Sequence, residues 1–203
     1  MIAIIDYGMG NLGSVLNMLK KVGAESGITS DPDQIANAEK LILPGVGSFD
    51  AAMRRIHDVK LFNLLNEQVL IKKKPVFGIC LGMHLLFESS EEGRLPGFGW
   101  IKGKVLSFKN RIPNSLKIPH MGWNDVSIIN QNDLTKGFTG DIRFYFVHSY
   151  FVKIENGENQ MMTCDYGLIF DAAVHKTNIY GAQFHPEKSH RYGMQLFKNF
   201  SEL

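Results

Sequence analysis

The residues of this sequence that are best placed to do chemistry include a cysteine held between two glycines. Gly78-Ile79-Cys80-Leu81-Gly82 has the spacing of a nucleophile elbow, the sharp strand-to-helix turn G-x-S-x-G, with sulfur in place of oxygen. Such a turn needs small residues two positions to either side, because the backbone folds too tightly there for a Cβ atom. It aims the side chain at the start of the next helix, where the free N–H groups favour a thiolate. The pattern predicts that Cys80 is a nucleophile, although a cysteine seen alone is more often a packed core residue.

A second motif lies a hundred residues further along. Phe184-His185-Pro186-Glu187 follows an apolar stretch that reads as a strand. Residues two apart in an extended segment share a face, so Glu187 can reach back to His185, and Pro186 stiffens the pair. A histidine oriented by a carboxylate is the base half of a Cys-His-Glu triad. A histidine at a strand end is often structural, but together with Cys80 the pair favours catalysis.

The elements that must position these residues begin with alternating apolar strands and amphipathic helices over the first ninety residues. Strands are expected at 2–5, around 28, at 41–43 and at 75–79. Asn11 is expected to cap a helix that Gly23 ends, and Pro32 to open a short one. Further helices are expected at 51–56, at 61–71 and, buried, at 83–87.

From residue 101 the pattern changes to short strands separated by turns. They are expected at 104–108, 143–147, 161–164, 172–175 and 179–184, before a last helix over 189–200. The whole pattern predicts an α/β fold with a mostly parallel central sheet, helices on both faces and a β-rich second half. We expect one domain over residues 1–203, with its site at the carboxyl ends of the strands.

The composition is that of an ordinary globular protein. Of 203 residues, 44% are hydrophobic and 21% charged, and the net charge of +2 gives no electrostatic reason to expect nucleic acid or a membrane as partner. Two cysteines make no disulfide framework, and Asp6 interrupts the apolar start of the chain too early for a signal peptide or a membrane span. A cytoplasmic protein is expected. The histidines and cysteines lack zinc-site spacing, so no metal site is expected.

The two motifs resemble those of the class I, or triad, glutamine amidotransferases, and the resemblance covers nearly the whole chain. Four segments narrow it to the glutaminase subunits of imidazole glycerol phosphate synthase, from histidine biosynthesis: residues 6–11, 44–47, 119–124 and 185–189. The resemblance implies hydrolysis of L-glutamine to glutamate and ammonia through a thioester on Cys80, with His185 as base and Glu187 orienting it. It implies no cofactor.

Further residues take roles only through this resemblance. It places the oxyanion donors at the backbone N–H groups of Leu81 and of the Val46-Gly47 turn, whose glycines would let it switch conformation. It places the glutamine pocket at Gly45, Gly47, His84, Glu92, His148, Ser149 and Tyr150. The implied partner is a (β/α)₈-barrel cyclase that forms a heterodimer with the chain and receives the ammonia. Interface candidates are Met9, Asn11, Met121, Trp123 and Asn124, although Trp123 could also be a buried core residue.

Two departures from the family pattern leave a related alternative open. His84 stands where the family has a glutamine that contacts the substrate, and Gly13 where many histidine-pathway members have arginine. Neutral histidine still offers one donor and one acceptor. A paralogous branch that is similar to this chain supplies ammonia to amidotransferases acting on bacterial surface sugars.

Two remote alternatives come from other protein classes. Residues 8–13 read G-x-G-x-x-G between a strand and a helix, with Asp31 about twenty residues on, which is the dinucleotide fingerprint of an NAD-binding oxidoreductase. That interpretation leaves the cysteine and histidine motifs unexplained. The other alternative is a stand-alone cysteine hydrolase that needs no partner.

Overall fold

Five parallel strands form the half of the sheet that carries the cysteine, in a computed structural model that describes residues 1–203. Their order across the sheet is β2-β1-β3-β4-β12. The strands are β1 (Ile2–Ile5), β2 (Ser26–Thr29), β3 (Lys40–Leu43), β4 (Val76–Ile79) and β12 (Ile179–Ala182). Every predicted strand of the first half is confirmed. Because β4 and β12 are parallel neighbours, the cysteine and histidine motifs emerge side by side at their carboxyl ends.

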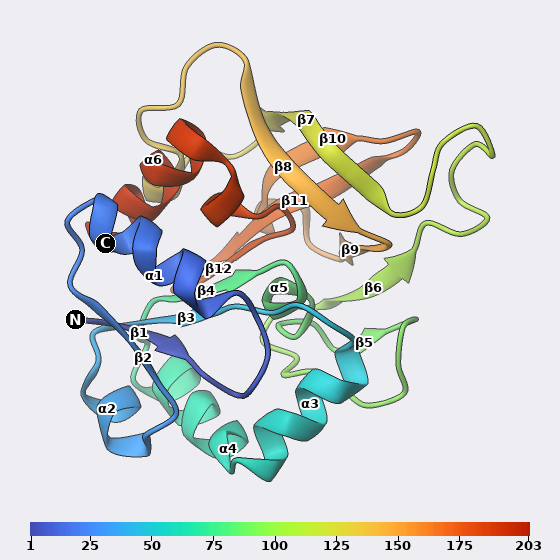
Figure 1. Ribbon diagram of the computed structural model, residues 1–203. Helices are drawn as coiled ribbons and strands as arrows, with labels where there is room; N and C mark the ends of the chain where they lie inside the picture. Colours follow the sequence, from blue (N-terminus) through green and yellow to red (C-terminus); the bar gives the residue numbers. More distant parts are fainter.

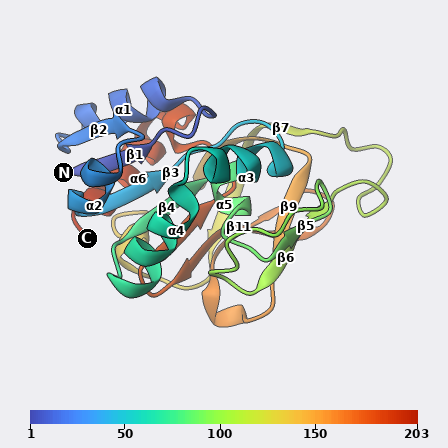
Figure 2. The same ribbon diagram turned by 90° about the horizontal axis from the view of Figure 1, so that it is seen from below.

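Helices cover both faces of this parallel half, as the alternation predicted (Figure 1). On one side lie α1 (Leu12–Lys21) and α6 (His190–Ser201); on the other lie α2 (Pro32–Asn37), α3 (Phe49–Asp58) and α4 (Leu61–Asn66). Figure 2, the view from below, puts α3 and α4 in front of the strands. Successive strand residues point to opposite faces, so Ile2 and Ile4 pack in the core under α1 and α6, while Ala3 and Ile5 pack in the other core.

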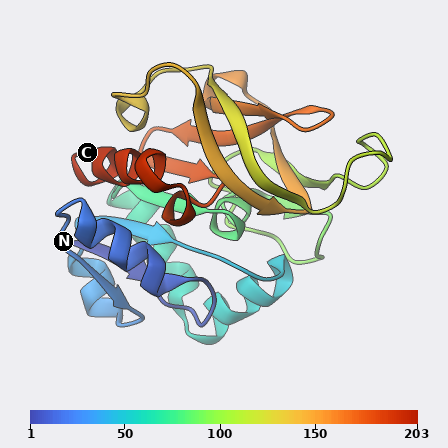
Figure 3. The same cartoon turned by 45° about the horizontal axis from the view of Figure 1, so that its top comes forward.

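The second half of the chain extends the sheet with antiparallel strands. Beyond β12 follow β11 (Ile169–Lys176), β10 (Gln160–Asp165), β7 (His120–Ile128) and β8 (Ile142–His148). A smaller group made of β5 (Ser89–Ser90), β6 (Gly103–Ser107) and β9 (Tyr150–Ile154) pairs with β11. Figure 3 shows the long strands β7 and β8 side by side, and the loop between β6 and β7 projecting from the body. The β-rich half is confirmed.

Strands β7 and β9 lie outside the strands expected from the sequence. β7 carries His120, Gly122, Asn124 and Asp125 among its apolar residues and is buried on neither face along most of its length. It therefore lacks the apolar run that marks a core strand. β9 follows β8 after the single residue Ser149, so no turn signal separates the two.

Three expectations about helices are wrong in detail. Asn11 stands at the N-cap position of α1, but its side chain makes no capping hydrogen bond. The helix expected over 61–71 is α4 followed by a π-helical turn at Glu67–Ile71. The helix after Cys80 is a single turn, α5 (Leu81–His84). It stops there because the next carbonyls, of Leu85 and Leu86, accept hydrogen bonds from the loop residues 98 and 101 instead of from helical N–H groups. No helix has both the length and the apolar character needed to cross a membrane.

Candidate active site

The turn around Cys80 has the geometry of a nucleophile elbow. Cys80 adopts φ 53° and ψ −109°, which a non-glycine residue enters only at a cost. Its N–H donates to the Ala182 carbonyl at 2.7 Å, which ties the elbow to β12. A Cβ at Gly78 would come within 2.6 Å of the Gly82 carbonyl oxygen, and one at Gly82 would overlap the Leu43 carbonyl oxygen. These close backbone contacts are the reason why glycine is required on both sides of Cys80, as the sequence predicted.

The histidine and glutamate of the second motif are paired and buried. His185 Nδ1 lies 2.7 Å from Glu187 Oε1, and the two side chains are 3% and 2% exposed. The other oxygen of Glu187, Oε2, is buried without a hydrogen-bond partner. Burying a carboxylate with one unpartnered oxygen costs free energy. The contact of Glu187 with His185 is the interaction that offsets this cost. The turn is held by Ser189, whose hydroxyl donates to the His185 carbonyl at 2.7 Å and accepts from the Tyr145 N–H at 3.0 Å.

The electrostatics of His185 favour its charged form. Burial works against the charge, but hydrogen bonding and the negative charges of Cys80 and Glu187 outweigh it and raise the pKa of His185 to about 10. A charged imidazole between a sulfur and a carboxylate is the arrangement that a thiol-based triad requires.

A cavity of about 310 Å³ opens in front of Cys80 and His185. Its wall contains most of the residues that the resemblance assigned to the glutamine pocket: Gly47, His84, Glu92, His148, Ser149 and Tyr150. Leu81, the other expected oxyanion donor, also lines it, with Val46, Pro119, Val147 and Lys188. Gly45 is the exception, since it does not line this cavity. It lies behind the elbow, where a Cβ would come within 2.8 Å of the Gly82 nitrogen and the Tyr7 hydroxyl. Gly45 therefore has no room for a side chain, and only glycine allows this close packing.

The expected oxyanion turn faces the same cavity. Gly47 adopts φ +124°, a conformation that favours glycine, and its N–H has no hydrogen-bond partner within the chain. The preceding Pro44 carbonyl is fixed by the Tyr7 hydroxyl at 2.6 Å. Burial raises the pKa of Tyr7 well above its ordinary value, so this hydroxyl stays a donor. One end of the turn is anchored and the other leaves a donor free.

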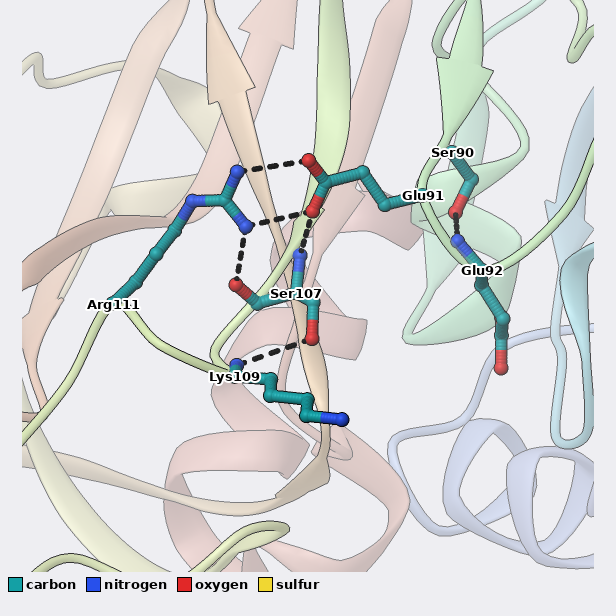
Figure 4. Close-up of polar contacts among 6 residues, drawn as sticks. All are labelled: Ser90, Glu91, Glu92, Ser107, Lys109 and Arg111. Carbon is teal, nitrogen blue, oxygen red and sulfur yellow. Dashed lines mark hydrogen bonds and ion pairs between the residues drawn. The ribbon is translucent and has the colours of Figure 1, made fainter. Parts of the chain in front are cut away.

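Glu92 is held in the cavity wall by two sets of contacts. Its Oε2 accepts from the Phe49 N–H at 3.0 Å, which supplies the cap that Ser48 does not give α3. Burial raises the pKa of Glu92, and this hydrogen bond opposes the rise. Its own N–H donates to the Ser90 hydroxyl at 3.1 Å. Figure 4 shows the neighbouring clamp, in which both Glu91 oxygens accept from the Arg111 guanidinium at 2.7 and 2.8 Å.

His148 belongs to a chain of hydrogen bonds that leads away from the cavity. Its Nδ1 lies 2.7 Å from the Tyr150 carbonyl oxygen, which can only accept, so this nitrogen carries the proton. His148 Nε2 then accepts from His120 Nδ1 at 2.9 Å, and His120 Nε2 lies 3.3 Å from the Asn124 amide nitrogen. Both histidines are neutral, because burial holds the pKa of His148 well below its ordinary value and lowers that of His120 to about 4.

The expected interface residues separate into two groups. Met121 and Trp123 point out from one face of β7 and are 61% and 43% exposed, so the interpretation of Trp123 as a core residue is wrong. Trp123 stacks on His190 at 5.6 Å. Asn124 lies on the opposite face, where its amide donates to the Asp165 carbonyl at 3.0 Å. Met9 is half-buried and Asn11 exposed at the start of α1.

Sequence reasoning missed several residues that support this site. Gln183 is fully buried and contacts both His84 and Cys80, and Ser189, His120 and Tyr7 act as described above. The signal for Gln183 was available: it is a polar residue in an apolar strand end, two positions before His185 and thus on the same face. For the other three, no spacing in the sequence links them to the cysteine.

The dinucleotide interpretation finds its acidic residue engaged elsewhere. Asp31, which should be free to bind a ribose hydroxyl, accepts from the Gln34 N–H at 2.9 Å and caps α2. No group of three or more His, Cys, Asp or Glu side chains is arranged to hold a metal ion.

The buried neutral histidines predict a loss of stability in mild acid. Burial lowers the pKa of His84 to about 4, against a hydrogen bond to Gln183 that favours the charge. Below pH 6.5 the unfolded chain therefore binds protons that the folded chain refuses, and stability falls as the pH drops toward 4. Between pH 6.5 and 5 each such histidine costs about 1.5 kcal/mol.

Urea unfolding at pH 6.5 and 5.0 tests this, with His84→Gln expected to lose about 1.5 kcal/mol less than the wild type. His185 acts in the opposite window: its contribution is present below pH 6.5 and is lost as the pH rises toward 10. Equal losses in the wild type and in His84→Gln would contradict the assignment of a buried neutral histidine.

Comparison with known proteins gives one consistent result. Residues 3–202 match the family model described as "Glutamine amidotransferase class-I". Imidazole glycerol phosphate synthase subunit HisH 2 of Methanococcus maripaludis is 55% identical over 98% of each chain. The protein of the same name from Pseudomonas aeruginosa is 51% identical over the full length of both.

Among solved structures the likeness is one of fold. PurLQS from Thermotoga maritima aligns with a TM-score of 0.76 at 20% identity, over 98% of this chain and 96% of that one. The glutaminase domain of Trypanosoma brucei CTPS aligns with a TM-score of 0.70 at 17% identity, over 99% and 93%. The family match over residues 3–202 and the relatives of 51% and 55% identity, which agree with the elbow and the buried histidine–glutamate pair, show the family. The chain belongs to the class I glutamine amidotransferases, and within them to the HisH subunits of imidazole glycerol phosphate synthase.

Proposed function

We propose that the chain hydrolyses L-glutamine to glutamate and ammonia and delivers the ammonia to a cyclase subunit of imidazole glycerol phosphate synthase. The observation that carries the proposal is that Cys80 and His185 line one cavity, with Glu187 buried behind His185 and in contact with its Nδ1. Cys80 lies at a strained turn and His185 is charged and buried beside it. We treat residues 1–203 as one amidotransferase domain. A free catalytic thiol fits a reducing compartment such as the cytoplasm.

The triad performs an acyl transfer in two halves. The Cys80 sulfur attacks the side-chain carbonyl carbon of glutamine, and His185 gives its proton to the amide nitrogen as the C–N bond breaks and ammonia leaves. The thioester that remains is attacked by water, whose proton passes to His185. The C–S bond then breaks, and glutamate and the original sulfur are released. Glu187 holds the imidazole in the orientation for both transfers.

The carbonyl oxygen of glutamine becomes negatively charged during both attacks and needs donors. We assign them to the backbone N–H groups of Leu81 and Gly47, which both line the cavity. The Gly47 N–H is free to turn toward an oxyanion, because it has no partner within the chain.

The remaining wall recognises the amino-acid end of the substrate. Glu92 is half-buried and offers a carboxylate to the α-ammonium group, while His148, Ser149 and Tyr150 form the wall across the cavity. The size of the cavity, about 310 Å³, suits a ligand as small as one amino acid.

The partner surface that we propose contains Met121 and Trp123, with Met9 and Asn11. The first two are large apolar side chains exposed on one face of β7, and such residues are enriched at protein interfaces. Asn124 is left out, because its amide is committed to contacts on the other face. The proposed occupant is a (β/α)₈-barrel cyclase, and the assembly a heterodimer.

Glutamine-dependent synthesis tests the function. The purified chain is mixed with a barrel cyclase subunit of imidazole glycerol phosphate synthase and that cyclase's nucleotide substrate, and ammonia and cyclised product are measured. We expect glutamine to support product formation only when both chains are present, and the cyclase to raise glutamine turnover at least tenfold. Ammonium salts with the cyclase alone serve as the control for acceptor activity.

The alternatives predict other outcomes of this assay, repeated with other acceptor proteins, and of an NAD-binding measurement on the same chain. Stimulation by a surface-sugar amidotransferase, and none by the cyclase, would move the acceptor to the paralogous pathway. Full turnover without any partner would indicate a stand-alone hydrolase. Tight NAD binding with no ammonia from glutamine would overturn the proposal altogether.

A further inference from the structure

One side chain outside the triad, that of Gln183, reaches the Cys80 sulfur. Gln183 follows β12 directly, and its side chain is fully buried between two residues of the cysteine turn. Its Oε1 lies 2.8 Å from His84 Nε2, and its Nε2 lies 3.9 Å from Cys80 Sγ, within the range of a hydrogen bond to sulfur. His84 and Cys80 are themselves only 4% and 8% exposed. Water therefore competes little for these contacts.

The direction of these hydrogen bonds follows from chemistry. A carboxamide oxygen can only accept, so His84 must carry its proton on Nε2 and donate to Gln183. With its oxygen engaged in this way, the amide turns its NH₂ group toward the sulfur. If His84 offered no donor, the amide could rotate by half a turn and present its oxygen to the sulfur instead. An oxygen there would repel a thiolate.

We propose that Gln183 is a positioning residue for the Cys80 sulfur, and that His84 sets its orientation. The inference rests on the proposed function of Cys80 as nucleophile. The Gln183 N–H stabilises negative charge on sulfur before attack and again when the thioester breaks. This gives His84 a role different from the substrate contact that the family resemblance implied: its ring donor acts on Gln183.

Other groups also act on the sulfur and are held constant in the test. His185 and, through it, Glu187 act from the histidine turn, and Tyr7 from the loop after β1. Besides His84, which the test varies, the remaining titratable side chains in the cavity wall are Glu92, His148, Tyr150 and Lys188.

Three variants of the full chain separate orientation from mere packing. Gln183→Met removes both hydrogen bonds at nearly constant volume. His84→Leu removes the donor that orients the amide, whereas His84→Gln can restore an N–H at the same number of bonds from the backbone. Gln68→Met is the matched control, since Gln68 is also buried, at 4% exposure, in the π-helical turn outside the cavity wall.

The readout is the rate of Cys80 alkylation by iodoacetamide as a function of pH, followed by peptide mass spectrometry that separates Cys80 from Cys164. Ammonia release from glutamine is measured beside it. We expect Gln183→Met and His84→Leu to shift the alkylation midpoint up by about one pH unit and to lower kcat about tenfold, with KM changing less. His84→Gln and Gln68→Met should keep the wild-type midpoint.

The two proposals can fail separately. If the wild type releases ammonia through Cys80 but Gln183→Met keeps its alkylation profile, the positioning role is wrong and the proposed function stands. The same conclusion follows if His84→Gln shifts the profile as far as His84→Leu does. If the wild type releases no ammonia whatever the profile, the proposed function itself fails.

Discussion

Replacement of Cys80 by alanine is expected to lower ammonia release from glutamine by at least about a thousandfold, because Cys80 is the one thiol in the cavity wall and the only nucleophile there with a charged histidine beside it. His185 and the oxyanion donors would remain, but water would have to attack an unactivated carboxamide directly. The measurement is a coupled glutamate dehydrogenase assay on the purified chain, with and without the cyclase.

The fold should survive this change. Cys80 is strained at φ 53°, and alanine keeps the Cβ atom and therefore the same strain. Circular dichroism and the urea midpoint are expected to stay close to the wild type. The matched control is Cys164→Ala, which removes the other buried thiol, in β10, where burial raises the pKa to about 12. Activity that persists in Cys80→Ala but falls in Cys164→Ala would reverse the assignment of the nucleophile.

The sequence was sufficient to predict the parallel half of the fold because its signals are local. Strands β1, β3 and β4 are short apolar runs, and the helices between them are amphipathic, so period and punctuation place them. The weaker β2, Ser26–Thr29, was expected only around Ile28. The two site motifs are also local. Five residues describe the turn at Cys80, and four describe the contact between His185 and Glu187, which the structure shows at 2.7 Å.

What the sequence could not predict depends on contacts between distant segments. Gln183 and His84 are 99 positions apart, and only the pairing of β4 with β12 brings them together. His120 meets His148 because they are partners across the antiparallel pair β7 and β8. The exposed face of β7 carries Met121 and Trp123 while the less exposed face carries His120, Gly122 and Asn124, so the sequence lacks the apolar-in, polar-out alternation of a core strand.

The same reasoning explains why Gly45 lies apart from the other glycine of its motif. Its motif, Pro44-Gly45-Val46-Gly47, reads in the sequence as one unit facing the substrate. In the structure the chain turns within it, so that Gly45 packs against Leu81 and Gly82 while Val46 and Gly47 line the cavity. Neighbouring glycines can thus serve two different needs: close backbone packing at one position and a left-handed φ at the next.

Gly82→Ala tests how far the position of the nucleophile depends on such packing. A Cβ there would overlap the carbonyl oxygen of Leu43, which belongs to a central strand and cannot move without disturbing its pairing. We expect the free energy of unfolding to fall by about 3 kcal/mol or more, which is large compared with the total stability of a domain. Urea denaturation followed by tryptophan fluorescence gives the value.

Gly13→Ala is the matched control, because it makes the same chemical change where a Cβ would meet nothing within 4 Å. Gly13 lies in α1 with an ordinary helical φ, so alanine should be neutral or stabilising by up to about 1 kcal/mol. A Gly82→Ala variant as stable as Gly13→Ala would show that β3 and the elbow can separate. The close approach of Gly82 to Leu43 would then not be what holds Cys80 at the end of β4, and the positive φ of Cys80 would need another cause.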